Sequence, residues 1–192
     1  MVEMSVAGLA IDAATRSPIV LLRDPTGRRQ IPIWIDHAQA HNIIAGLQGK
    51  PVPRPLTHDL MVDLLNAGNL NLERVIIHAI EDSTFRAVLK LRSVSKQDQQ
   101  AEQDPSEFIE IDSRPSDAIA LAVRTSSGIW MLEEVVAAAS IAVDEEADAE
   151  DQDEFRKFLD QVSPAELIRQ HQTRGPKPYP FEAGDSDPTS NP

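Results

Sequence analysis

The chain has 192 residues and a formal net charge of −13 at pH 7, and it contains no cysteine. Its length allows one full hydrophobic core plus a tail, and the missing cysteine excludes disulfides and thiolate zinc sites. No apolar run approaches the roughly 18 residues of a membrane span and the first residues do not resemble a signal peptide, so we expect a cytoplasmic protein. The acidic balance disfavours a broad basic face for long nucleic acid, because phosphate neutralisation supplies most of the affinity of such binders.

The N-terminal segment predicts three strands, the last two joined by a hairpin. Residues 2–11 alternate between apolar and polar, and residues 19–23 form a compact apolar run that is typical of a buried strand. Residues 24–27 carry Pro and Gly at the second and fourth positions of a type I turn, which leads into a strand over residues 29–35. Pro32 has no N–H to donate, so we expect this strand at a sheet edge or Pro32 facing outward.

A helix is predicted from an N-cap at Asp36 to about Leu47. His37 and His41 are four residues apart and share one face of it, a spacing that can bind zinc. The sequence supplies neither the acidic residue nor the third ligand of a known zinc pattern, and solvated histidines are commoner, so we favour a structural role for this pair.

The second predicted helix follows an Arg-Pro pair that begins at Arg54. Thr57 is the expected N-cap. Asp59 lies in the first turn, where its charge complements the helix dipole, and Gly68 ends the helix. Apolar residues recur in it at spacings of three and four, which predicts one buried face: Leu60, Met61, Leu64 and Leu65.

A second hairpin follows, with strands expected over residues 72–80 and 84–91. Residues 95–106 are polar and predict an exposed loop. After the next strand and helix, a short strand over residues 128–132 and a short helix over residues 133–140 complete the predicted core.

The sequence changes from strand to helix between residues 108 and 123. Residues 108–112 alternate as a strand does, and Pro115 suits a first helical position because its φ is fixed and its N–H is absent. Asp117 lies in the first turn, where a carboxylate can accept free backbone N–H groups. Residues 118–123 are apolar nearly all round, which predicts a buried helix.

Two helix entrances therefore each carry an arginine and an aspartate. We expect Arg54 and Asp59 at one entrance to share a site with Arg114 and Asp117 at the other. The alternative is purely structural. In that case Arg54–Asp117 and Arg114–Asp59 are ion pairs that stabilise two capped helices, a common arrangement that looks the same in sequence.

The C-terminal segment is predicted to be separate from this core. Residues 143–192 hold 13 acidic against 5 basic residues. We divide them into an acidic linker with short helices over residues 143–174 and a disordered tail over residues 175–192. A capping box over residues 163–166 opens one of the short helices. A protein partner or a second subunit is expected to dock through residues 144–172.

Three motifs resemble those of the bifunctional nuclease (BFN) domain family: Pro-Ile-Trp-Ile at residues 32–35, Arg-Pro-Leu-Thr-His-Asp-Leu at residues 54–60, and Asp-Ser-Arg-Pro-Ser-Asp-Ala-Ile-Ala-Leu-Ala at residues 112–122. The similarity covers residues 1–142, which we interpret as a bifunctional nuclease-like domain. It implies a single compact α+β domain, and the hairpin pattern predicts a mixed or antiparallel sheet packed with several helices. It also implies degradation of both DNA and RNA by a bacterial or plant protein. The acidic tail resembles that of cyanobacterial members.

One residue departs from the family pattern. Many members have Glu in the helix that follows the Pro-Ile-Trp-Ile strand, where this chain has Gln39. If that carboxylate serves as a metal ligand or a base in the family, its loss weakens or abolishes activity here.

Phosphodiester hydrolysis needs a neutralised phosphate, an activated water and a stabilised leaving oxygen. Arginine forks and helix N-termini bind phosphate oxygens. These chemistries assign phosphate binding to four residues of the two entrances: Arg54, Thr57, Arg114 and Ser116.

Hard divalent cations prefer carboxylate oxygens and activate water, so we expect Mg²⁺ or Mn²⁺ at Asp59, Asp112 and Asp117. His58 can act as general base or acid because its unperturbed pKa lies near neutrality. The predicted catalytic residues are therefore His58, Asp59 and Asp117.

The predicted function is a metal-dependent phosphodiester hydrolase of low sequence specificity, with DNA and RNA as transient substrates. The alternative is a non-enzymatic oligomeric interaction or regulatory module that uses the acidic C-terminal segment. The acidity, Gln39 and the missing basic face favour this alternative. Apolar helices and edge strands lead us to expect a homo-oligomer, and no membrane contact is predicted.

Overall fold

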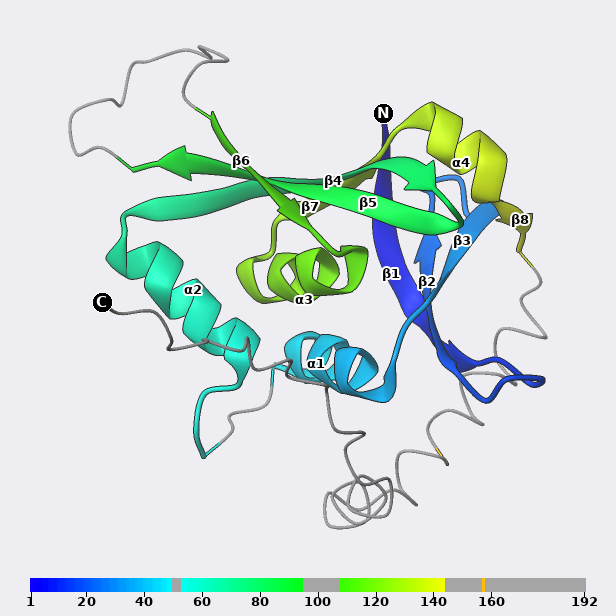
Figure 1. The fold of residues 1–192 in the computed structure, drawn as a ribbon, viewed down its shortest axis with the longest axis horizontal. Helices are drawn as coiled ribbons and strands as arrows, with labels where there is room; N and C mark the ends of the chain where they lie inside the picture. Colours follow the sequence, from blue (N-terminus) through cyan, green and yellow to red (C-terminus); the bar gives the residue numbers. More distant parts are fainter. Residues whose placement is uncertain (50–52, 95–107, 144–156, 158–192) are drawn as a thin grey trace, which may run out of the picture. The chain divides into compact units, whose positions relative to one another are not determined.

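The computed structural model describes residues 1–49, 53–94, 108–143 and 157 (Figure 1). In chain order the elements are β1 (Val2–Ile11), β2 (Pro18–Arg23), β3 (Arg29–Trp34), α1 (His37–Gln48), α2 (Thr57–Ala67), β4 (Leu70–Glu81), β5 (Thr84–Ser93), β6 (Phe108–Ser113), α3 (Pro115–Thr125), β7 (Gly128–Met131), α4 (Glu133–Ala139) and β8 (Ile141–Ala142). The strands form an eight-stranded sheet in the order β6-β5-β4-β7-β1-β2-β3-β8. Strands β4 and β7 pair in parallel, whereas β4–β5, β1–β2 and β2–β3 are antiparallel hairpins. The predicted α+β class with a mixed sheet is confirmed.

Helix α3 is the central helix of the fold. It lies against β4, β5 and β7, and helices α1 and α2 pack beside it (Figure 1). Each residue from Ala118 to Ala122 is at most 1% exposed, which confirms the predicted buried helix. Pro115 occupies the first helical turn, as its fixed φ predicts. Because α3 begins directly after β6, its N-terminus is held at the end of an edge strand.

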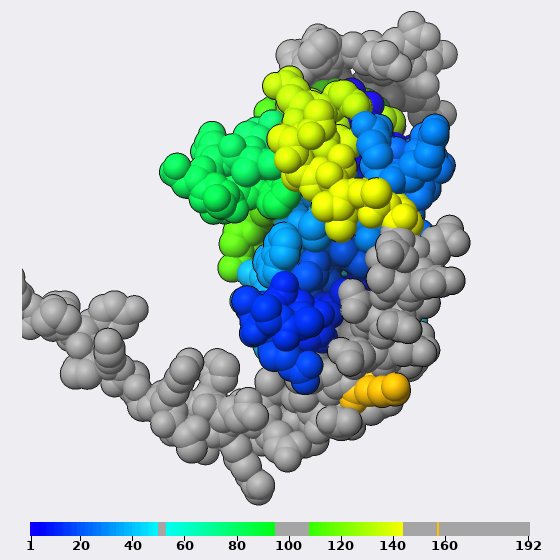
Figure 2. Space-filling view, turned by 90° about the vertical axis from the view of Figure 1, so that its right-hand side faces the viewer, coloured from blue at the N-terminus to red at the C-terminus, as the bar shows by residue number. Residues whose placement is uncertain are grey.

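The hairpin of β2 and β3 forms as the sequence predicts, and β1 pairs with β2 on its other side. The N–H of Gly27 donates to the carbonyl of Asp24 at 3.0 Å, which closes the turn between β2 and β3. Strand β8 is too short to be recognised from sequence, and it pairs only with Arg29 and Gln30 of β3. Pro32 therefore lies beyond this pairing, as its missing N–H requires. Figure 2 shows α4 and β8 (yellow) against this hairpin (blue).

The start of α2 differs from the prediction. Leu56, not Thr57, is the N-cap, and Thr57 is the first helical residue. No side chain caps from the Leu56 position, but the carboxylate of Asp59 accepts the N–H of Leu56 at 2.8 Å. An acid at the third helical position thus satisfies the backbone group in front of the helix, so a hydroxyl at the N-cap is not needed.

The buried face of α2 also differs from the prediction. Leu60, Met61 and Leu64 are 52%, 37% and 62% exposed. Leu65 is the one residue of the predicted face that is half-buried. The side that packs on α3 and β4 carries it together with His58 (buried) and Val62 (half-buried), at an equally helical spacing. The three/four spacing fits both sets, and a histidine in the second set hid it from a search for apolar periodicity.

The chain divides into two units, Met1–Arg156 and Lys157–Pro192, and Lys157 is the described residue of the second. The predicted boundaries after residues 142 and 174 stay predictions. The predicted loop over residues 95–106 lies outside the described residues, as does the docking segment over residues 144–172 apart from Lys157. Among the described helices, none is long and apolar enough to cross a membrane.

Candidate functional site

The two helix entrances meet. Nε2 of His58, in the first turn of α2, lies 3.3 Å from Oδ1 of Asp117, in the first turn of α3. The other carboxylate oxygen of Asp117 accepts a hydrogen bond of 2.6 Å from Nε of Arg114. This bond raises the pKa of Arg114 from its ordinary value. Residues 59 positions apart are thus joined in one chain of contacts, Arg114–Asp117–His58.

This chain of contacts runs from solvent into the core. The side chain of Arg114 is 67% exposed, that of Asp117 is 25% exposed and that of His58 is 7% exposed. Nδ1 of His58 is buried and has no hydrogen-bond partner in the part of the chain that the structure describes. A buried N–H without a partner costs more than a buried lone pair beside apolar groups, so we assign the proton to Nε2, which then donates to Asp117. The histidine therefore orients the carboxylate.

Asp59 serves a different contact. Its Oδ1 accepts a 2.6 Å hydrogen bond from Nε of Arg124, and this bond, with the Leu56 N–H, lowers the pKa of Asp59. Arg124 also donates to the carbonyls of Asn42 and Ala120 at 2.8 and 2.9 Å. A single nearly buried guanidinium thus ties α1, α2 and α3 together, which makes the Asp59–Arg124 pair structural.

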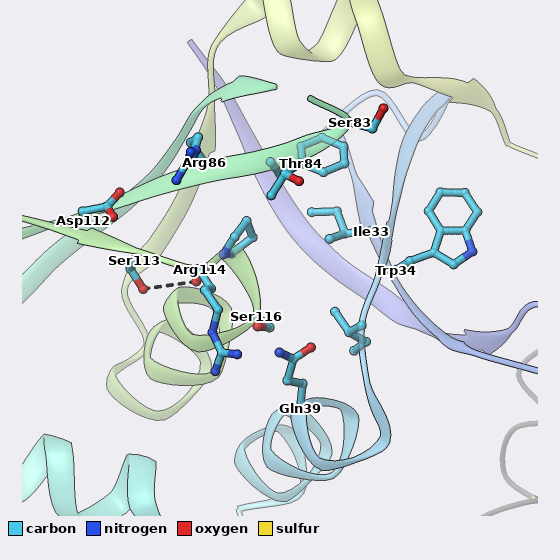
Figure 3. Close-up of a pocket in the computed structure, with 13 residues that line it drawn as sticks. Ile33, Trp34, Gln39, Ser83, Thr84, Arg86, Asp112, Ser113, Arg114 and Ser116 are labelled. Atoms are coloured by element: carbon cyan, nitrogen blue, oxygen red, sulfur yellow. Dashed lines mark hydrogen bonds between the residues drawn. The ribbon is translucent and has the colours of Figure 1, made fainter. Parts of the chain in front are cut away.

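An open cleft of about 310 Å³ lies beside Arg114 (Figure 3). Four segments form it: the end of β3 with Ile35, the first turn of α1, the turn and start of β5, and the junction of β6 with α3. The residues that line it are Ile33, Trp34, Ile35, Gln39, Ser83, Thr84, Phe85, Arg86, Asp112, Ser113, Arg114, Pro115 and Ser116. Segments that are far apart in the sequence therefore build one concave surface at the N-terminus of α3.

Gln39 closes one side of the cleft. The side-chain oxygen of Gln39 accepts a hydrogen bond from the backbone N–H of Asp36 at 2.9 Å. The backbone N–H of Gln39 donates to the Asp36 carboxylate at 2.7 Å. This reciprocal pair is a capping box, which accepts Gln as well as Glu. Because the oxygen is taken by an N–H donor, the amide nitrogen must occupy the other position, and Figure 3 shows the amide directed towards the side of Arg114 and Ser116. Gln39 thus keeps the helix cap and presents N–H donors.

Ser116 lies in the second helical position of α3 and is 5% exposed. It lines the cleft, and no hydrogen bond of its hydroxyl is found among the described residues. The N-cap residue of α3, Arg114, makes no side-chain capping bond. Buried hydroxyls normally have a partner, so an open one beside an uncapped helix N-terminus is a place for a polar ligand.

A family model described as the bifunctional nuclease domain matches residues 20–144. The chain belongs to the bifunctional nuclease domain family. Two proteins from two strains of Mycobacterium tuberculosis, "Uncharacterized protein MT1877" and "Uncharacterized protein Rv1829", are each 34% identical over 172 residues. These alignments cover 85% of this chain and 96% of each relative. The family match contains every residue that lines the cleft.

In this member of the family, the sequence-predicted site residues fall into three groups. Arg114, Ser116 and Asp112 line the cleft. Asp117 and His58 stand behind Arg114 in the chain of contacts. Arg54 and Thr57 are exposed at the start of α2 and do not line the cleft, and Asp59 is held by Arg124.

The structural alternative named two ion pairs, Arg54–Asp117 and Arg114–Asp59. The pairs that form within the described residues are instead Arg114–Asp117 and Arg124–Asp59. Sequence reasoning missed Arg124, although one signal was available. An arginine at the end of a helix that is otherwise apolar all round must find an acidic or carbonyl partner in the core.

The predicted metal ligands do not form a ligand set. Among the described residues, no three His, Asp or Glu side chains lie close enough to hold a metal ion. Asp59 is engaged by Arg124, and Asp117 by Arg114 and His58. In this arrangement Asp59, Asp112 and Asp117 are not brought together around one shared Mg²⁺ or Mn²⁺ ion.

Proposed function

We propose that this chain is a nuclease that cleaves phosphodiester bonds of DNA and RNA in the cleft beside Arg114. The observation that carries the proposal is the contact chain Arg114–Asp117–His58, which joins two helix entrances at the edge of an open cleft. Membership in the bifunctional nuclease domain family supports the same reaction class. Because one fold can serve many activities, the residues of the site carry the assignment.

Each residue has a role that its surroundings permit. Arg114 keeps its outer N–H groups for a phosphate while its Nε holds Asp117. Ser116 adds a hydroxyl beside the N-terminus of α3, whose dipole favours the negative charge of the substrate. Asp117, which is 25% exposed and paired with Arg114 beside the cleft, would accept the proton of the attacking water. His58 is a positioning residue, because it is buried behind Asp117 and does not line the cleft.

A requirement for Mg²⁺ or Mn²⁺ stays a prediction. Calorimetric titration of the full chain with each ion tests it directly. An ion held by Asp117 would have to displace Arg114 or His58 from the carboxylate, and Asp117→Asn should abolish its uptake. If Asp117→Asn binds Mg²⁺ or Mn²⁺ as tightly as the unsubstituted chain does, the ion binds at a site that does not include Asp117.

Two substitutions test the proposed roles. Asp117→Asn removes the proton acceptor and should lower the cleavage rate of single-stranded RNA and DNA by roughly 10²–10⁴-fold, the usual contribution of general acid–base catalysis. His58→Ala should also remove most activity, because the carboxylate loses its orienting donor. Asp63→Asn is the matched control, since Asp63 is exposed on the same helix as His58. Full activity of both variants after stringent purification would show that the roles are assigned wrongly.

A non-enzymatic module remains the alternative, and one observation favours it: both aspartates of the helix entrances are engaged by arginines. The discriminating measurement is cleavage by the purified full chain with and without Mg²⁺ or Mn²⁺. A folded protein that cleaves neither RNA nor DNA under any of these conditions supports the module. The predicted homo-oligomer is independent of this choice, and light scattering of the eluting protein measures it.

A further inference from the structure

The cleft beside Arg114 is small for a nucleic-acid site. Its volume of about 310 Å³ lies at the lower end of the range for small-molecule pockets and admits no double helix. The chain carries a net charge of −13, so a long phosphate backbone would meet repulsion outside the cleft. The small volume and the negative charge both indicate a substrate that is bound through one nucleotide.

We propose that the cleft is a single-nucleotide site, in which Gln39, Arg114 and Ser116 hold the phosphate and the apolar wall holds the base. The substrate class is then short single-stranded oligonucleotides, bound through one nucleotide. This inference rests on the proposed nuclease function for its reaction, but nucleotide binding can be measured without any cleavage.

Three donors from two helices define the phosphate position. The Gln39 amide nitrogen faces the cleft because its oxygen is fixed by the N–H of Asp36. Arg114 has one nitrogen committed to Asp117, and a guanidinium offers further N–H groups. The Ser116 hydroxyl is in a residue that is 95% buried, lines the cleft and has no protein partner among the described residues. A hydroxyl that opens onto the cleft from a nearly buried residue at a helix N-terminus is a donor available to a bound anion.

The acidic side chains around this position are partly neutralised by the two arginines that line the cleft. Gln39 is neutral where a glutamate would repel phosphate. The Asp117 carboxylate is already paired with Arg114 and held by His58. Asp112 lines the cleft together with Arg86, which carries the opposite charge and is itself paired with Glu81.

Apolar side chains supply a surface for the base. Ile33 and Ile35 are 4% and 8% exposed and end the β3 side of the cleft, and Phe85 is half-buried at the start of β5. Figure 3 shows Ile33 between Thr84 and Gln39. Phe85 is the aromatic face on which a base would stack, with the two nearly buried isoleucines behind it. Every base has a face for stacking, so the site should show little preference among bases.

The test is calorimetric titration of the full chain with uridine 5′-monophosphate, inorganic phosphate and uridine. The monophosphate should bind more tightly than either part alone. Ser116→Ala and Gln39→Glu should each weaken monophosphate binding at least about tenfold, because a hydrogen bond to a charged group is lost and, in Gln39→Glu, a like charge is added. Glu preserves the capping box, so Gln39→Glu keeps the helix. Gln48→Glu makes the same chemical change at the exposed end of α1 and should bind as the unsubstituted chain does.

Several results would overturn the inference. Monophosphate binding that survives both Ser116→Ala and Gln39→Glu would place the nucleotide elsewhere. Inorganic phosphate that binds as tightly as the monophosphate would reduce the site to an anion site without a base surface. Cleavage of long single strands without any monophosphate binding would overturn the inference and leave the nuclease proposal standing. Monophosphate binding without cleavage would support the inference and contradict the nuclease proposal.

Discussion

At the scale of single residues, the site depends on which partner each aspartate takes. Asp117 is shared between an exposed arginine and a buried histidine, whereas Asp59 is held by Arg124 inside the helix layer. The sequence predicted the positions of Asp59 and Asp117 in two first turns correctly, but it could not assign their partners. Arg124 and Asp117 lie two turns apart on α3. The packing of α1, α2 and α3 directs Arg124 to Asp59 of α2.

The Asp59–Arg124 pair predicts a dependence of stability on pH. The hydrogen bond from Arg124, with that of the Leu56 N–H, lowers the folded-state pKa of Asp59 below its ordinary value of 3.8. The stabilisation is therefore fully present above the unfolded-state pKa and is lost as pH falls through the lower folded-state pKa. Urea unfolding between pH 7 and pH 2 should show this loss below about pH 4.

Asp59→Asn should lower the free energy of unfolding at pH 7 and flatten its fall below pH 4, because the titrating group is gone. Asp63→Asn, on the exposed side of α2, should leave both unchanged. An acid transition of the same steepness in Asp59→Asn and in the unsubstituted chain would contradict the role of this pair.

Gln39 shows what a residue-by-residue comparison with a family can miss. From sequence, the replacement of Glu by Gln indicates a lost carboxylate. In the structure, the side-chain oxygen caps α1 and the nitrogen enters the cleft, so the residue keeps one role and gains a donor. The hydrogen bond of the Asp36 N–H decides the orientation, and that bond depends on a cap geometry that the sequence only partly specifies.

At the scale of elements, patterns that report local geometry predicted well, and patterns that need a packing partner did not. Three predicted features depend on neighbours in the chain: the turn at Asp24, the capped start of α1 and the apolar stretch of α3 over residues 118–123. All three formed as predicted. Strand β8 has two residues, and it forms because their backbone pairs with the free edge of β3. The buried face of α2 was assigned to the wrong stripe, because helical spacing alone fits two faces.

The turn between β4 and β5 makes a prediction at this scale. Asp82 and Ser83 have φ of 47° and 60°, the left-handed conformation that a two-residue hairpin turn requires and that Asn-Gly adopts most readily. Replacing both residues by Asn and Gly should raise the free energy of unfolding by about 1 kcal/mol, since each left-handed residue other than Gly carries strain. The midpoint of thermal unfolding should rise by about 2–4 °C.

The same change bears on the cleft, which Ser83 lines. If the Asn-Gly variant unfolds at a higher temperature and binds the monophosphate as the unsubstituted chain does, the strain at residues 82 and 83 arises from the hairpin and has no role in binding. A lower midpoint of thermal unfolding in the Asn-Gly variant would contradict the assignment of strain to this turn.

At the scale of the whole molecule, the chain is acidic, and the cleft beside Arg114 gathers donors for phosphate. The overall charge predicts weak binding of long nucleic acid, and the small cleft predicts that few phosphates are contacted. The sequence predicted that two helix entrances share a site, because both carry Arg and Asp in equivalent positions. It could not predict that the end of β3 and the β4–β5 turn complete the cleft, since a sheet order with β7 between β1 and β4 brings those segments together.

The central claim is that the entrances of α2 and α3 act as one unit, joined by the contact between His58 and Asp117. A double-mutant cycle measures this directly, with His58→Ala, Asp117→Asn and the combination compared by the rate of cleavage of a short single-stranded RNA. If the residues act as one unit, the double variant should be no slower than Asp117→Asn alone, because the histidine works only through the carboxylate. Losses that multiply in the double variant would show that the two residues act independently and would contradict the account.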